Sequence, residues 1–233
     1  NKEGWFPWIF RQCDIHPSMK ILEAGCGDGA LWTENLNLLP EKISITLSDI
    51  SEGMLRDARR AVDASDRRFS YRRFDCAKIP FEAASFDLVI ANHVLFYCEN
   101  LPSVCREIKR VLKPGGRFIC STYGKKHMQE VSSLVQSFDE RIVLSADKLY
   151  EKFGRENGAE ILSCFFSEVN WISYEDSLFI PESEPLISYI LSCHGNQNQY
   201  ILEHYKEFRS FVSRKTKNGF SVTKDAGIFI CAN

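Results

Sequence analysis

The sequence lacks several features that would assign it to a class of protein at once. Its 233 residues contain no apolar run near the ~20 residues that a membrane span needs, and no secretory signal is visible. The nine cysteines include no Cys-x-x-Cys pair, so the usual spacing for zinc or an iron–sulfur cluster is missing. We therefore expect no metal, no membrane contact and reduced thiols in a cytoplasmic protein.

A large excess of charge of either sign is also missing. The 29 lysines and arginines nearly balance 31 aspartates and glutamates, for a formal net charge of −2. Such a chain has no electrostatic signature for a polyanion, so nucleic acid is not an expected partner. Arginines are frequent between residues 56 and 73, but aspartates alternate with them and favour a solvated helix face.

A glycine-rich turn is the most informative feature that the sequence does have. Residues 21–29 read Ile-Leu-Glu-Ala-Gly-Cys-Gly-Asp-Gly, between an apolar run and an amphipathic segment. Glycines at such a turn allow positive φ and let the backbone approach a ligand closely. Asp49 closes the next apolar run, where an acid can accept hydrogen bonds from both hydroxyls of a ribose. The pattern predicts a site for an adenosine-containing cofactor.

Two classes of cofactor fit these glycines. Gly25, Gly27 and Ala30 satisfy the looser dinucleotide fingerprint, which leaves a nicotinamide-dependent oxidoreductase as an alternative. Glu23 favours the other class, because a carboxylate inside the turn would repel a pyrophosphate and attract a cationic amino group or a sulfonium. The sequence also contains no Tyr-x-x-x-Lys pair of the kind that catalyses hydride transfer.

Three further motifs follow the glycine turn in order. Asp75 lies within Arg-Phe-Asp-Cys-Ala at residues 73–77, and residues 85–93 read Ser-Phe-Asp-Leu-Val-Ile-Ala-Asn-His. The third motif is Leu-Lys-Pro-Gly-Gly at residues 112–116. With these motifs the chain resembles the class I S-adenosylmethionine-dependent methyltransferases, particularly the small-molecule type, over residues 19–123. The resemblance implies S-adenosylmethionine as cofactor, S-adenosylhomocysteine as product and a small-molecule acceptor.

The resemblance also implies which positions contact the cofactor. Asp49 would bind the ribose, Asp75 the adenine amine, and Asn92 the methionine part. The ordinary alternatives are that Asp49 caps the following helix, that Asp75 pairs with nearby arginines, and that Met54 is a core residue. The full predicted set is Glu23, Ala24, Gly25, Gly27, Asp49, Ile50, Met54, Asp75, Cys76 and Asn92.

The predicted chemistry needs few catalytic groups. Positioning of the two reactants contributes on the order of 7–11 kcal/mol to such a transfer, and a general base is needed only when the acceptor must lose a proton. The candidate catalytic residues are His93 and Tyr97 after the fourth strand and His127 after the fifth, although His93 could simply orient its loop. No Pro-Pro-aromatic sequence follows the fourth strand, which argues against a nucleic-acid base as acceptor. A methyltransferase-like protein that acts on a protein, or has no turnover, is the second hypothesis.

The apolar periods predict an α/β fold with a doubly wound, mostly parallel sheet and helices on both faces. The resemblance implies seven strands in the order 3-2-1-4-5-7-6, with strand 7 antiparallel. We expect one domain over residues 1–233, and the sequence leaves open whether it is a monomer or a homodimer. Its predicted parts are a helical lead-in at 1–18, broken by Pro7, a cofactor-binding core at 19–123, and a helical cap insertion at 175–214 over the acceptor site.

The same periods give approximate bounds for each element. Strands are predicted at 19–24, 43–49, 69–74, 86–91, 117–123, 160–174 and 219–232. Helices are predicted at 30–39, 52–63, 101–112, 128–138, 146–157 (ended by Gly158), 185–193 and 197–213.

Overall fold

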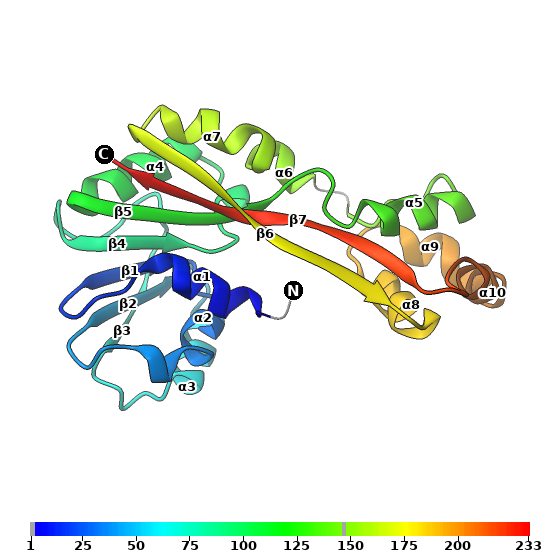
Figure 1. The fold of residues 1–233 in the computed structure, drawn as a ribbon, viewed down its shortest axis with the longest axis horizontal. Coiled ribbons are helices and arrows are strands. Elements are labelled where there is room, and N and C mark those ends of the chain that lie inside the picture. Colours follow the sequence, from blue (N-terminus) through cyan, green and yellow to red (C-terminus); the bar gives the residue numbers. More distant parts are fainter. Residues whose placement is uncertain (1–2, 146–147) are drawn as a thin grey trace.

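The computed structural model describes residues 3–145 and 148–233, in which strands and helices alternate through the first half of the chain (Figure 1). The strands are β1 (Lys20–Ala24), β2 (Ser44–Asp49), β3 (Phe69–Arg73), β4 (Phe86–Ala91), β5 (Leu112–Tyr123), β6 (Glu168–Ile180) and β7 (Phe220–Ala232). The α-helices are α1 (Trp5–Cys13), α2 (Ala30–Thr33), α3 (Glu52–Ala61), α4 (Leu101–Val111), α5 (Gln129–Phe138), α6 (Leu149–Lys152), α7 (Arg155–Ser163), α8 (Ser183–Ser192), α9 (Gln197–Ile201) and α10 (Tyr205–Lys215). Short 3-10 turns are η1 (Leu36–Leu38), η2 (Leu95–Tyr97) and η3 (Leu202–His204).

The strands form one seven-stranded sheet in the order β3-β2-β1-β4-β5-β7-β6. Strands β1 to β5 are parallel, whereas β7 runs antiparallel to both β5 and β6. The predicted fold class, strand order and antiparallel seventh strand are therefore confirmed. In such a sheet the strand order reverses between the parallel strands β1 and β4, and the loops after their carboxyl ends form a crevice where ligands bind.

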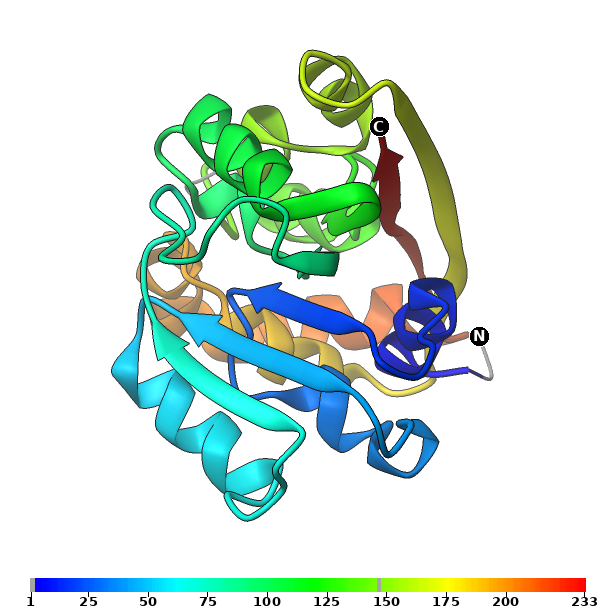
Figure 2. The same ribbon diagram turned by 90° about the vertical axis from the view of Figure 1, so that its left-hand side faces the viewer.

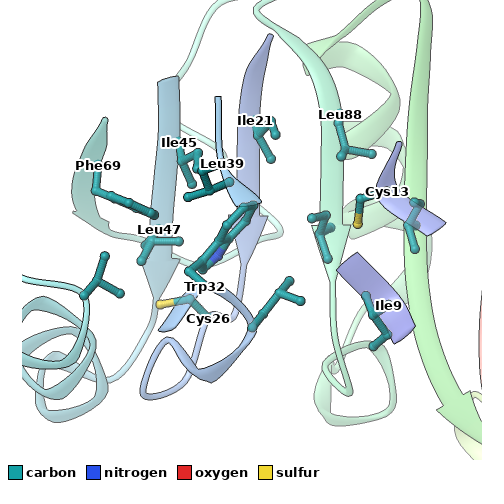
Figure 3. Packing of buried hydrophobic residues seen from close by; sticks show 14 of the residues in the cluster. Ile9, Cys13, Ile21, Cys26, Trp32, Leu39, Ile45, Leu47, Phe69 and Leu88 are labelled. Atoms are coloured by element: carbon teal, nitrogen blue, oxygen red, sulfur yellow. The ribbon is translucent and has the colours of Figure 1, made fainter. Parts of the chain in front are cut away.

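Successive side chains of the central strands point to opposite faces of the sheet, and each face has its own hydrophobic core. On the first face, Ile21 and Leu88 pack with helices α1 to α3 around the fully buried Trp32 (Figure 3). On the opposite face, Leu22 and Val89 pack against α4 and α7. Helices α3 (cyan) and α4 (green) lie on opposite sides of the sheet in Figure 2. Both cores hold the carboxyl ends of the strands in fixed positions.

Strands β6 and β7 continue past the sheet as a long two-stranded arm that ends in a helical lobe (Figure 1). The lobe consists of α5, α8, α9 and α10, which share a third core with the end of the arm. Residues 175–180 of the predicted cap thus belong to β6, and only residues 183–215 form the helices beyond it. The helical content of the predicted insertion is confirmed, and its role over an acceptor site stays a prediction.

Several predicted helix bounds were wrong for identifiable reasons. Pro7 does not break α1, because a proline in the first helical turn removes an N–H that has no partner there. The predicted strand at 160–174 begins only at Glu168, since α7 extends to Ser163. Gly158 lies inside α7 rather than after a helix. Glycine fits this position because an added Cβ would lie 2.4 Å from the Phe229 ring.

Two more predicted helices are divided. The predicted helix at 30–39 consists of α2 and η1. In the prediction at 146–157, residues 146–147 lie outside the described residues, and the remainder divides between α6 and α7 at Gly154. Within the described part of the chain, no helix is both long and apolar enough to cross a bilayer.

Candidate active site

The glycine turn between β1 and α2 is the base of the site. Gly25 has φ +80°, and a Cβ on it would lie 2.4 Å from Val94 Cγ2, so only glycine fits this close approach. The N–H groups of Gly25 and Cys26 each donate to the Ser48 carbonyl at 2.8 Å, which fastens the turn to the end of β2. Gly27 also has positive φ, +56°, and its Cα faces a cavity.

Asp49 connects this turn to the next loop. Its Oδ2 accepts a hydrogen bond from Gly27 N–H at 3.1 Å, and its Oδ1 accepts from Ser51 N–H at 2.8 Å. The helix cap is Ser51 rather than Asp49, because Ser51 Oγ accepts from Met54 N–H at 3.3 Å. Asp49 therefore remains at the cavity wall with its carboxylate oriented by two backbone donors.

Glu23 does not lie where the sequence reasoning placed it. Its carboxylate is buried beneath the turn and accepts a hydrogen bond from Trp32 Nε1 at 2.6 Å. Burial raises the pKa of Glu23 to about 8, although the Trp32 bond acts in the opposite direction. Of the described residues, neither Glu23 nor the buried Ala24 lines the cavity. The placement of this carboxylate inside the turn was wrong, because its strand position points it into the first core.

The other eight predicted cofactor residues line one cavity of about 720 Å³ at the carboxyl ends of β1, β2 and β4. Ile50 and Met54 form an apolar wall and leave 64% and 45% of their surfaces exposed. Asp75 lies on the same wall, and its Oδ1 accepts from Ala77 N–H at 2.8 Å. The eight residues are Gly25, Gly27, Asp49, Ile50, Met54, Asp75, Cys76 and Asn92.

The far side of the cavity is a hydrogen-bonded group around Asn92. Its Oδ1 accepts from Ser121 Oγ at 2.6 Å and from Trp5 Nε1 at 3.3 Å. The same Ser121 hydroxyl accepts from His93 N–H at 2.8 Å. His93 has φ +55°, and its imidazole stacks on Trp5 with ring centroids 5.1 Å apart. Helix α1 therefore closes this side of the site, because its Trp5 side chain covers Asn92 and His93.

The three candidate catalytic residues divide between two cavities. His93 and Tyr97 line the first, and Tyr97 is 68% exposed at its mouth. His127 lines a second cavity of about 570 Å³ between the sheet and the helical lobe. An aromatic series joins the two, since Phe96 contacts both Tyr97 and Tyr123 with centroids 4.7 and 5.4 Å apart.

Both histidines are neutral near pH 7. Burial is the main reason that the pKa of His93 falls to about 4, and His127 nearby adds to the shift. Burial likewise lowers the pKa of His127 to about 4, and Lys224 contributes. Its Nδ1 accepts from Asp225 N–H at 3.2 Å, so any proton on the neutral ring lies on Nε2. A group with so low a pKa is a weak general base.

The residues of the first cavity fit an adenosine-containing cofactor. Its volume lies within the range of about 300–1,000 Å³ that is usual for such ligands. The glycine turn offers close backbone approach, the two exposed apolar side chains offer a surface for a planar base, and Asp49 offers acceptors for hydroxyls. Among the described residues, no group of three or more His, Cys, Asp or Glu side chains could hold a metal ion.

Several residues of this site were not in the predicted set, among them Trp5, Ser121 and Cys98. Trp5 and Ser121 were not predicted to touch Asn92, because their contacts depend on how α1 and β5 pack against β4. Cys98 was missed as well, although its Sγ lies 3.6 Å from Cys76 Sγ. No spacing pattern signals a pair of thiols that are 22 residues apart.

Comparisons with known proteins agree with this geometry. Residues 22–120 match the methyltransferase domain family. A malonyl-[acyl-carrier protein] O-methyltransferase of Enterobacter lignolyticus is 32% identical over 125 residues, covering 52% of this chain and 46% of that protein. A demethylmenaquinone methyltransferase of Symbiobacterium thermophilum is 34% identical over 120 residues, covering 51% and 48%. The matched segment spans about half of this chain and about half of either relative.

A solved structure covers nearly the whole chain. The YcgJ protein from Bacillus subtilis superposes with a TM-score of 0.63 over 97% of this chain and 96% of its own, at 14% identity, which shows a shared fold. Fold and site together define a Rossmann-like domain for an adenosine cofactor. Residues 22–120 are a methyltransferase domain of the class I, S-adenosylmethionine-dependent type, and the cofactor of that type of domain is S-adenosylmethionine.

Proposed function

We propose that this protein transfers a methyl group from the first cavity to a small-molecule acceptor held in the second. The observation that carries the proposal is that Tyr97, which lines the first cavity, and Tyr123, which lines the second, both pack against the ring of Phe96. When bound, S-adenosylmethionine supplies a methyl group on a cationic sulfur, which keeps the bonding electron pair and leaves as S-adenosylhomocysteine. The lone pair of the acceptor forms the new bond, and the chain's residues align and enclose the two reactants.

The residues of the first cavity have distinct proposed roles. Asp49 accepts from the ribose hydroxyls, Asp75 from the adenine amine, and Ile50 and Met54 cover the base. Asn92 presents its amide to the amino-acid part, with Ser121 and Trp5 fixing the orientation of that amide. Glu23 supports the glycine turn from beneath through Trp32 instead of contacting the cofactor.

An acceptor with negative charge suits the second cavity best. The described residues that line it include Lys125 and Lys148, of which Lys148 also pairs with Glu151 at 3.3 Å, and no carboxylate. Asp49, Asp75 and Glu99 line the first cavity. Both buried histidines are neutral and weakly basic, so neither is an effective general base. An acceptor that is nucleophilic without losing a proton does not require such a base. A carboxylate meets both conditions. One relative is named a malonyl-[acyl-carrier protein] O-methyltransferase and another a demethylmenaquinone methyltransferase, so acceptors differ widely among relatives.

A transfer assay with methyl-labelled S-adenosylmethionine tests this function. The full chain is incubated with matched panels of carboxylates, amines, phenols and thiols, with a metabolite extract and with candidate proteins. The proposal expects label in a small carboxylate and equimolar S-adenosylhomocysteine. Label in protein supports the alternative of a protein substrate, and bound cofactor with no labelled product supports a protein without turnover.

A pair of lysine variants tests the site of the acceptor. Lys125→Met with Lys148→Met should raise KM for the acceptor about tenfold and leave the affinity for S-adenosylhomocysteine unchanged. Lys152→Met is the matched control, because Lys152 is exposed on α6 and does not line the cavity. An unchanged KM in the double variant contradicts the proposed acceptor site.

A further inference from the structure

Two thiols face each other in the wall of the cofactor cavity. Cys76 follows Asp75 after β3, and Cys98 follows η2 after β4. Their Sγ atoms lie 3.6 Å apart, and both residues line the first cavity. All nine cysteines are free, and five of them, Cys13, Cys26, Cys105, Cys120 and Cys231, are buried in the cores. Cys76 and Cys98 are only partly buried, so a small oxidant can reach them from the cavity.

We propose that Cys76 and Cys98 form a reversible disulfide that closes the cofactor cavity under oxidising conditions. The proposal rests on the proposed function in one respect, namely that this cavity is where the cofactor binds. The two sulfurs must approach from 3.6 Å to about 2.05 Å, a shift that side-chain rotation and a small loop movement supply. The bond would join two loops that no backbone pairing connects directly.

Hydrogen peroxide serves as the oxidant, and the chemistry balances. The Cys76 thiolate attacks one peroxide oxygen, breaks the O–O bond and becomes a sulfenic acid while hydroxide leaves. The Cys98 thiol then gives its proton to the departing hydroxyl group as its sulfur attacks the Cys76 sulfur, so the S–S bond forms and water leaves. The two thiols lose two electrons and two protons in total, and the peroxide becomes two waters.

The surroundings favour Cys76 as the attacking group. The hydrogen bond between the two thiols lowers the pKa of Cys76 and raises that of Cys98. Thiolate character and a neighbouring resolving thiol are the features that make a cysteine respond to peroxide. Cys164 is exposed, and its thiol donates to the Glu160 carbonyl at 3.5 Å rather than to a second thiol, so it would stop at the sulfenic acid or react with an external thiol.

Disulfide formation would alter the cofactor contacts directly. Asp75 precedes Cys76, and its carboxylate is fixed by the N–H of Ala77 on the other side of that cysteine. A movement of Cys76 toward Cys98 therefore displaces the Asp75 carboxylate, which is the proposed hydrogen-bond acceptor for the adenine amine. It also displaces Tyr97, which directly precedes Cys98. By linkage, a cofactor that binds the reduced form better must shift the thiol–disulfide equilibrium toward the two thiols by the same factor.

The experiment compares the reduced and peroxide-treated full chain by peptide mapping and by calorimetric titration with S-adenosylhomocysteine. The proposal expects a Cys76–Cys98 linked peptide and at least about a tenfold loss of affinity, within the usual range of coupling between sites, and recovery with dithiothreitol. Thermal melting of the oxidised form checks that the loss is not unfolding. Saturating S-adenosylhomocysteine should slow formation of the linked peptide.

Two variants make the comparison specific. In Cys98→Ser the ratio of affinities before and after peroxide should be one, whatever the starting affinity. Cys164→Ser should respond as the original chain does. Absence of the linked peptide, or a linked peptide with unchanged affinity, overturns the proposal. A reduced chain that does not bind S-adenosylhomocysteine contradicts the proposed function instead, and the peptide map still decides whether the two thiols pair.

Discussion

The carboxylate of Asp49 accepts a hydrogen bond from the backbone N–H of Gly27 at 3.1 Å, across the mouth of the glycine turn. Its second oxygen accepts from Ser51 N–H at 2.8 Å. The Asp49 side chain thus holds the turn after β1 and the start of α3 in fixed positions at the wall of the cavity. The same side chain is the proposed ribose acceptor, so structure and binding depend on it together.

Replacement of Asp49 by alanine should weaken S-adenosylhomocysteine binding by about 10- to 100-fold. Hydrogen bonds to a charged group contribute about 1.5–3 kcal/mol each, and the variant loses those to the cofactor as well as the two within the protein. Calorimetric titration measures the change. Asp57→Ala is the matched control, because Asp57 is exposed on α3 and does not line the cavity. Unchanged affinity in Asp49→Ala would remove this residue from the site.

Gly25→Ala should destabilise the fold more than Gly115→Ala does. Both glycines have positive φ, +80° and +75°, so both substitutions incur about 1–2 kcal/mol of backbone strain. Only Gly25 also has a neighbour in the way, Val94 at 2.4 Å, whereas nothing lies within 4 Å of a Cβ at Gly115. Urea unfolding compares the two free energies. Equal losses of unfolding free energy in the two variants would mean that the Val94 side chain moves aside without a measurable energetic cost.

The stability of the protein should depend on the ionisation of Glu23. Its pKa of about 8 in the fold is above the ordinary value of 4.5, so the folded state binds more protons than the unfolded state between these pH values. The contribution of Glu23 to stability therefore falls as pH rises from about 4.5 to 8, by at most about 1.4 kcal/mol per pH unit. His93 and His127, with pKa values lowered to about 4, contribute the opposite slope only below pH 6.5.

The pH window from 6.5 to 8 isolates the effect of Glu23. Glu23→Gln retains an oxygen that can accept from Trp32 and cannot ionise. Its melting temperature should lose the downward slope in this window, and at pH 8 the variant should be more stable than the original chain. Parallel melting curves for the two proteins across the window would show that Glu23 is already ionised in the fold.

Trp5→Ala should raise the pKa of His93 toward its ordinary value. The Trp5 ring covers this imidazole at 5.1 Å, and burial is the main cause of the lowered pKa. Histidine NMR titration measures the shift. Phe10→Ala is the control, because Phe10 lies on the same helix but its ring contacts Trp32. If His93 still titrates near pH 4 in Trp5→Ala, burial by this helix is not the cause.

The sequence was most informative where local chemistry and strand order act together. Residues at the carboxyl ends of parallel strands must meet at one edge, so Gly27, Asp49, Asp75 and Asn92 could be predicted to share a cavity, and they do. Strand 86–91 was predicted at its observed bounds, because an apolar run of this length between polar groups is typical of a buried strand in a parallel sheet.

The rest depended on packing that no short pattern records. The direction of the Glu23 side chain follows from which face of β1 it occupies, and both faces of a buried parallel strand are apolar in sequence. Trp5 reaches Asn92 from a distance of 87 residues along the chain. The extension of β6 and β7 beyond the sheet depends on the third core, which has no separate signal in the sequence.

Calorimetric titration of the reduced full chain with S-adenosylmethionine, S-adenosylhomocysteine and NADH tests the central claim most directly. The account predicts micromolar binding of the first two at one site per chain and no heat with NADH. Binding of NADH alone would contradict the assignment of the cavity. Binding of none of the three would contradict the donor site in this chain and leave only the fold.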